Sequence, residues 1–236
     1  SNRMSCRGLA TFTTTNPAGT TTWLDYTGRV DTASEGGMLG LAFHPDFPAT
    51  LFIAEPQAGG AWPGDPRMSD RTRGLLTDLG ATILPFTAQV FGADYPQGNK
   101  IEALTALPDA PFLFLDTDTL ITGPISAIPF DVTRPSASMR RENTWPAVEL
   151  YGPTPAQTWK SLYDRFGLDF DSSLDPSQPE GYWQRYLYFN AGWFFAESPR
   201  AFGNRFLDWA RTIRDDPPPE LVCQELSPWL DQITLP

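Results

Sequence analysis

A short apolar run that ends in two aspartates is the feature that most restricts how this chain can fold. Phe112 to Leu115 are four consecutive apolar residues, which predicts a buried strand. This strand delivers Asp116 and Asp118 to its carboxyl end, where open α/β sheets place their ligands. Two carboxylates so close together repel each other unless a cation neutralises them. The motif Asp116-Thr117-Asp118 therefore predicts a site for a hard divalent cation, with an ordinary capped turn as the alternative.

From about residue 50 the sequence alternates between strand and helix patterns. Strands are predicted at 51–54, 81–84 and 112–115, an aromatic strand pair at 186–195, and helices over 99–107 and after the capping residues Ser69, Thr154 and Ser198. Strands that alternate with helices favour right-handed crossovers. We therefore expect an α/β domain over residues 50–236, with a mainly parallel sheet flanked by helices.

Residues 1–49 form a different kind of segment, rich in threonine and glycine and without a helical period. Within it, residues 31–47 resemble a blade segment of the glucose/sorbosone dehydrogenase type of β-propeller. One blade cannot close a propeller, because each blade buries its faces against its neighbours, and the chain offers no second copy. The resemblance therefore implies no dehydrogenase. We expect a β-like N-terminal segment followed by the α/β domain.

The charge and the cysteines restrict partners and location. A formal net charge of −11 disfavours nucleic acid as a partner, since a phosphate backbone would be repelled. Cys6 and Cys223 fit no metal-binding spacing, which favours free thiols in a reducing compartment. No apolar run approaches the roughly 20 residues that span a bilayer, and no signal-peptide pattern opens the chain. A cytoplasmic protein is expected, with its oligomeric state open.

Two further polar motifs lie downstream of the aspartates. Asn190-Ala191-Gly192 interrupts an apolar strand, and its glycine permits close approach of a ligand to the backbone, although a β-bulge explains the same pattern. Asparagine supplies such a ligand with both a hydrogen-bond donor and an acceptor. Asp231-Gln232 follows a predicted short helix, where a polar turn is the alternative.

The three motifs, taken in this order and at this spacing, resemble the GT-A fold glycosyltransferases, most closely the retaining glycogenin- and galactosyltransferase-like branch. The resemblance covers residues 50–236 and implies a Rossmann-like GT-A domain. It implies that Asp116 and Asp118 bind Mn²⁺ or Mg²⁺, which bridges the diphosphate of a nucleotide sugar. Thr117, Asn190, Ala191 and Gly192 would line the nucleotide-sugar pocket. Asp231 and Gln232 would face the sugar at the reacting carbon.

The implied activity is metal-dependent transfer from a nucleotide-diphosphate sugar, expected to be a UDP-sugar, to a carbohydrate or lipid-linked acceptor with retention. Lys100, at the start of a predicted helix, could neutralise the diphosphate, with a solvated first-turn lysine as the alternative. The family commonly adds a histidine as a third metal ligand after Asp-Gln. The single histidine of this chain, His44, precedes the domain, so either the copy is truncated at its C-terminus or two aspartates and water hold the metal.

Other functions compete with this one. A non-catalytic nucleotide-sugar or carbohydrate-binding module would keep the same motifs without turnover. A haloacid-dehalogenase-like phosphatase also places Asp-x-Asp at a strand end, but its motif strand usually comes first in the chain, and two predicted strands precede it here. The aromatic residues around 182–195, together with Trp145 and Trp159, suggest an acceptor groove, although filling of the core is favoured.

Overall fold

The computed structural model describes residues 11–16, 19–25, 39–43 and 50–236, apart from positions 118, 120, 122, 124, 140 and 141; before residue 50 it describes the backbone alone. The strands are β1 (Thr11–Asn16), β2 (Gly19–Asp25), β3 (Leu39–Phe43), β4 (Phe52–Pro56), β5 (Thr82–Phe86), β6 (Phe112–Leu115), β7 (Ser136–Met139) and β8 (Phe189–Ala196). The α-helices are α1 (Asp70–Asp78), α2 (Asn99–Ala103), α3 (Pro155–Phe166), α4 (Pro199–Asp215) and α5 (Leu230–Ile233).

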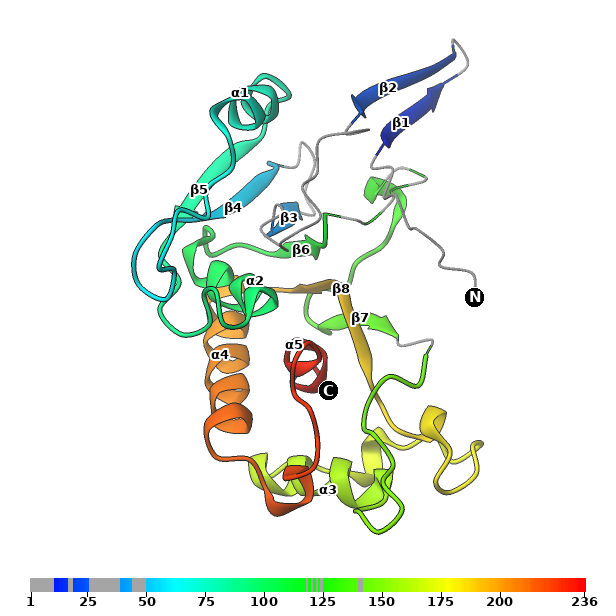
Figure 1. Cartoon of the computed structure of the whole chain (residues 1–236). Coiled ribbons are helices and arrows are strands. Elements are labelled where there is room, and N and C mark those ends of the chain that lie inside the picture. The colour runs from blue at the N-terminus through cyan, green and yellow to red at the C-terminus, as the bar shows by residue number, and fades with distance from the viewer. Residues whose placement is uncertain are drawn as a thin grey trace, which may run out of the picture.

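A mixed six-stranded sheet in the order β5-β4-β3-β6-β8-β7 forms the centre of the α/β fold (Figure 1). Among the described strands of this sheet, β4 and β5 pair in parallel and every other neighbouring pair is antiparallel. The prediction of a mainly parallel sheet is therefore wrong. Strands β4, β5 and β6 do run in one direction, but β3 lies antiparallel between β4 and β6. Only residues 44–51 join β3 to β4, which is too short for the crossover that a parallel pair needs.

The N-terminal segment contributes to two sheets. Strands β1 and β2 form an antiparallel pair of their own, while β3 belongs to the central sheet. The predicted boundary between residues 49 and 50 thus falls after a strand that the main sheet includes. Most of the propeller-like stretch, residues 31–47, lies outside the described residues.

The helices begin where the capping residues predict. The side chain of Ser69 accepts a hydrogen bond from the backbone at the start of α1, and Ser198 does the same for α4. At α3, Thr154 and Gln157 form a reciprocal capping box, and the helix ends at Gly167 in the left-handed conformation. The predicted helix over 99–107 is confirmed as α2 followed by a 3₁₀ turn.

Strand β6 lies in the core of the protein because both of its faces are covered. Phe112 and Phe114 contribute to one hydrophobic cluster, while Leu113 and Leu115 pack with Ile53 on the other side of the sheet. Helix α5 contacts both α4 and β8, and it lies between them in Figure 1. The carboxyl end of β6 is thereby brought next to α5, which carries Asp231 and Gln232.

The aromatic residues fill this core. Trp145, Trp159 and Tyr188 are at most 2% exposed. Their rings contact one another, with centroids 4.9 Å apart for the two tryptophans. The interpretation as core filling is confirmed for these residues, and an acceptor groove lined by them is ruled out. The predicted strand pair over 186–195 is likewise wrong, because Phe189–Ala196 forms the single strand β8.

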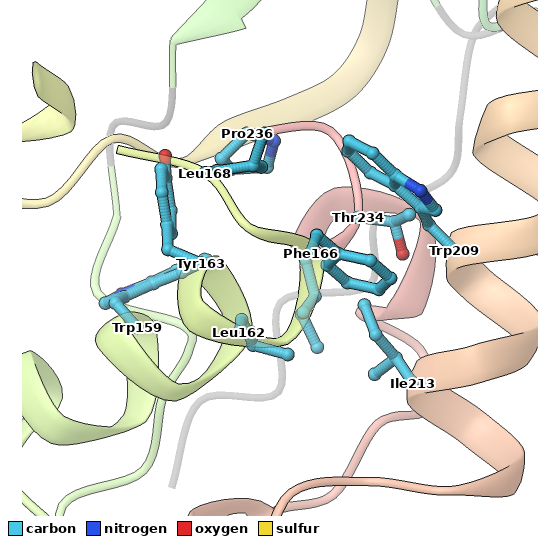
Figure 2. Close-up of a pocket in the computed structure, with 10 residues that line it drawn as sticks. Trp159, Leu162, Tyr163, Phe166, Leu168, Trp209, Ile213, Thr234 and Pro236 are labelled. Carbon is cyan, nitrogen blue, oxygen red and sulfur yellow. The ribbon is translucent and has the colours of Figure 1, made fainter. Parts of the chain in front are cut away.

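A small apolar pocket lies between α3, α4 and the C-terminal residues (Figure 2). Phe166 stacks on Trp209 with ring centroids 4.6 Å apart, and Ile213 and Thr234 complete this side of the pocket. Its volume of about 20 Å³ is close to that of a single water molecule. This pocket is therefore a packing defect and not a substrate site.

Candidate functional site

Lys100 lies at the centre of a buried charge cluster beside the end of β6. Its Nζ atom is 3.0 Å from both carboxylate oxygens of Asp116 and 3.0 Å from Oδ2 of Asp231. It also donates to the carbonyl oxygen of Ala191 at 3.4 Å. The lysine side chain is 7% exposed and that of Asp231 is 3% exposed, whereas Asp116 is 31% exposed. The alternative of a solvated first-turn lysine is therefore wrong.

Tyr95 holds Asp231 from the other side. Its hydroxyl group accepts a hydrogen bond from the backbone N–H of Asp231 at 3.0 Å. The proton of the same hydroxyl is shared between Oδ1 of Asp231 at 2.9 Å and the carbonyl oxygen of Pro228 at 3.1 Å. Three segments distant in sequence, the loop before α2, the end of β6 and α5, are thus joined by one set of polar contacts.

The charges in this cluster set the protonation of its members. Burial would lower the pKa of Lys100, but the neighbouring carboxylates of Asp231 and Asp116 raise it above its ordinary value. Burial, reinforced by the negative charge of Asp231, also raises the pKa of Tyr95. Lys100 is therefore a cation and Tyr95 a neutral hydroxyl at physiological pH. One lysine facing two carboxylates leaves a formal charge of −1 on the three side chains.

Close backbone contacts join the end of β6 to β8. The N–H of Asp116 donates to the carbonyl oxygen of Gly192 at 2.8 Å, and Thr119 donates through its backbone to Asp116 at 3.0 Å. The N–H of Gly192 in turn donates to Oδ1 of Asn190 at 2.8 Å. A Cβ atom at Gly192 would lie 2.7 Å from that oxygen, so glycine allows the side chain of Asn190 to fold back on the strand.

A cavity of about 480 Å³ opens beside these contacts, a size typical of small-ligand sites. The residues that line it come from β7, the segment after it, β8, the turn after β6 and the start of α5: Thr119, Ser138, Met139, Glu142, Thr144, Asn190, Gly192, Trp193, Trp229 and Gln232. Ser138 also donates to the backbone carbonyl of Asn190, which fixes β7 against β8 at this point.

The predicted site residues thus fall into two adjoining places. Lys100, Asp116, Ala191 and Asp231 belong to the buried cluster, with Ala191 contributing its backbone carbonyl. Three others, Asn190, Gly192 and Gln232, line the cavity. Thr117 is a half-buried turn residue next to Asp116, and Asp118 lies outside the described residues. The sequence predicts that Asp231 and Gln232 follow a short helix. This prediction is wrong, because both residues are part of α5 itself.

A family model described as the Rhodobacterales glycosyltransferase domain matches residues 41–236. The chain belongs to this family. No curated protein and no solved structure matches it. The match supports glycosyl transfer, and it begins within β3, before the predicted boundary at residue 50. It gives no support to the phosphatase or dehydrogenase interpretations.

Oxygen donors for a metal ion in this glycosyltransferase lie at the carboxyl end of β6. Within the described residues, no group of three or more histidine, cysteine, aspartate or glutamate side chains could hold a metal ion. Asp116 offers carboxylate oxygens, which hard divalent cations prefer, and the residual negative charge around Lys100 favours a further cation. The residues thus fit a hard cation in donor type, but Asp116 alone does not complete a ligand set.

Several residues of the site were missed from the sequence. Tyr95 precedes Pro96 in what reads as an ordinary loop, and nothing local indicates that it reaches α5. Trp193 directly follows the Asn-Ala-Gly motif, so its position in the cavity could have been expected from the motif. Glu142 and Trp229 belong to no motif.

Elsewhere in the described chain, Cys223 is a free, exposed thiol. None of the described helices has the length and apolar character needed to cross a bilayer.

Proposed function

We propose that this glycosyltransferase moves a sugar from a nucleoside-diphosphate sugar, a UDP-sugar, to an acceptor hydroxyl, in a GT-A-type site at the carboxyl end of β6. The observation that carries the proposal is the buried ammonium group of Lys100 held against Asp116. Together with a divalent cation at Asp116, the fixed charge of Lys100 would offset the negative charge of a diphosphate, because charges are poorly screened in a buried site. The partly exposed Asp116 marks the side from which that ligand would approach.

The reaction places its largest charge change on the leaving group. The bond between the sugar's anomeric carbon and the diphosphate oxygen breaks, and its electron pair leaves with the nucleoside diphosphate. The acceptor oxygen forms the new bond to that carbon and loses its proton. Lys100 would stabilise the charge that grows on the diphosphate, and it needs no reorganisation because Asp116 and Asp231 already hold it in place.

A divalent cation is proposed as the cofactor, held by Asp116 and Asp118. When bound, Mn²⁺ or Mg²⁺ supplies Lewis-acid stabilisation of the departing diphosphate. The formal charge of −1 on Lys100, Asp116 and Asp231 supports this proposal, because a negatively charged site attracts a divalent cation.

The residues around the sugar divide into those that contact it and those that position others. Asn190 and Gln232 line the cavity, and their amides are proposed to bind sugar hydroxyls. Asp231 is buried against Lys100 and Tyr95, so we assign it a positioning role that acts through Lys100, in place of the direct contact with the sugar that the resemblance implies. Retention of anomeric configuration stays a prediction from the resemblance, testable by NMR of the product, and a cytoplasmic location also stays a prediction.

Binding of UDP with and without Mn²⁺ tests the proposal first. UDP with Mn²⁺ should raise the melting temperature of the wild-type protein by several degrees, and UDP alone by less. The variant Lys100→Met should lose this shift. Lys160→Met is the matched control, because Lys160 is the only other lysine and its side chain is 55% exposed. No shift with UDP or GDP, with or without metal, would rule out both a transferase and a nucleotide-sugar-binding module.

Turnover separates those two functions. Release of UDP or GDP from a panel of nucleotide sugars is expected if the protein is a transferase, because water can take the place of the acceptor hydroxyl. Metal-dependent binding without any release, in the presence of mixed sugar acceptors, would instead select the non-catalytic module.

A further inference from the structure

The cavity beside the Lys100 cluster has a distinct chemical character. Five neutral hydrogen-bonding side chains and two indole rings line it, and Glu142 is the only ionisable group among the described residues that do so: the neutral groups are Thr119, Ser138, Thr144, Asn190 and Gln232, and the rings are Trp193 and Trp229. Indole faces stack on the apolar face of a sugar ring, while amides, hydroxyls and a carboxylate exchange hydrogen bonds with its hydroxyl groups. A nucleotide diphosphate would need cations, and the described residues of this lining include none.

The cavity also lies next to the proposed site of the leaving group. Thr119 is bonded through its backbone N–H to Asp116, and Gly192 accepts the N–H of Asp116. The backbone N–H of Gln232 donates to Asp231 at 3.0 Å. Three residues that line the cavity are thus hydrogen-bonded to Asp116 or Asp231, the two residues whose side chains hold Lys100. A sugar hydroxyl bound in the cavity would therefore face the donor's reacting end.

We propose that the part of this cavity around Glu142 is the acceptor site and takes an uncharged sugar ring, with Glu142 accepting hydrogen bonds from its hydroxyl groups, while Asn190 and Gln232 hold the donor sugar. The identification as an acceptor site rests on the proposed function. Glu142 is exposed and comes from the segment between β7 and α3, whereas Gln232 belongs to α5. A carboxylate at an open rim is placed to select among ring hydroxyls, which makes Glu142 a specificity-determining residue.

Ligand-detected NMR with simple sugars tests this proposal. The probes are the methyl glycosides of glucose, galactose, mannose and N-acetylglucosamine, together with the methyl glucuronide and galacturonide as acidic counterparts. Each is titrated into the protein with UDP and Mn²⁺ present. We expect at least one neutral glycoside to bind the wild type, and Glu142→Gln to weaken its binding about tenfold, the loss expected for a hydrogen bond to a charged group.

Glu149→Gln is the matched control, because Glu149 is exposed on the same segment but does not line the cavity, and it should bind within about twofold of the wild type. Arg140 and Arg141 lie outside the described residues, so the acidic counterparts are measured and not assumed to be rejected. Tighter binding of the glucuronide or galacturonide than of the neutral glycosides would overturn the proposal. Failure of every neutral glycoside to bind, or equal binding by Glu142→Gln, would also overturn it.

Competition between the glycoside and UDP-glucose distinguishes a failure of the acceptor-site proposal from a failure of the proposed function. Displacement of the glycoside by UDP-glucose but not by UDP would assign the cavity to the donor sugar and contradict an acceptor site. Binding of a neutral glycoside that depends on Glu142, with no stabilisation by any nucleotide, would contradict the proposed function instead, and would leave the cavity as a sugar-binding site.

Discussion

The ammonium group of Lys100 lies 3.0 Å from the carboxylate of Asp231, and both side chains are almost fully excluded from solvent. This contact ties α2 to α5 and fixes a positive charge beside the exposed edge of Asp116. A buried ion pair of this kind is weak evidence for stability as such, since dehydrating both charges offsets much of their attraction. Its value to the protein is the fixed position of the charge.

Replacing Lys100 should therefore destabilise the folded protein. Lys100→Met leaves the buried carboxylate of Asp231 without its cation, so we expect the free energy of unfolding to fall by about 3 kcal/mol. Urea denaturation at pH 7 measures this change. Lys160→Met removes an exposed lysine paired with Asp164 along α3 and should alter stability by less than about 0.5 kcal/mol. Equal changes in the free energy of unfolding for the two variants would contradict a buried charge cluster around Lys100.

The tyrosine hydroxyl gives an independent test of the same cluster. Tyr95→Phe leaves the backbone N–H of Asp231 without its partner, and we expect a loss of about 1–3 kcal/mol in the free energy of unfolding. Tyr182→Phe serves as the control, because Tyr182 is 42% exposed. Asp231 would also be held less firmly, so UDP binding by Tyr95→Phe should weaken. Unchanged stability and unchanged UDP binding would argue against a role of the Tyr95 hydroxyl in holding Asp231.

The pH dependence follows from the raised pKa of Lys100. A lysine whose pKa in the folded state exceeds the ordinary value of 10.5 stabilises the protein fully below that pH, and the stabilisation is lost as the pH rises through the folded-state pKa. The difference in unfolding free energy between wild type and Lys100→Met should be constant from about pH 7 to 9 and should shrink above about pH 10.5. Denaturation curves across this range measure it, and a decline centred near neutral pH would contradict a charged, paired lysine.

A side chain at Gly192 should displace the side chain of Asn190. In Gly192→Ala the new methyl group would lie 2.7 Å from Oδ1 of Asn190 and displace that side chain from the backbone of β8. We expect donor turnover to fall at least about tenfold with a modest loss of stability. In Gly74→Ala, on α1, the methyl group meets nothing within 4 Å, so this variant should keep its activity and gain up to about 1 kcal/mol. Equal turnover by Gly192→Ala and wild type would remove the proposed role of Asn190.

Local signals in the sequence predict the elements well and their assembly less well. The capping residues Ser69, Thr154 and Ser198 mark helix starts correctly, because a cap depends on residues within one turn. Strand direction depends on long-range pairing. The position of β3 between β4 and β6 therefore could not be predicted from the alternation of strands and helices.

The residues of the site likewise divide into those that local motifs predict and those that depend on long-range contacts. Asp116, Asn190 and Gln232 are found from short motifs, because the motif residues follow one another along a strand end or helix. The burial of Lys100 and the contact of Tyr95 with Asp231 join segments far apart in the chain, and no local pattern encodes them. Glu142 enters the cavity only through the course of the segment after β7.

Release of nucleoside diphosphate from nucleotide sugars by wild type and Asp116→Asn, each with Mn²⁺ or with chelator, tests the central claim most directly. Asp116→Asn keeps the shape of the side chain and removes its charge. The account predicts metal-dependent release of UDP from a UDP-sugar by the wild type. Release by the variant should be at least about 100-fold slower, which is the rate loss typical of removing one charged contact to the transition state. Release at the same rate by both proteins, or no release from any nucleotide sugar, would contradict it.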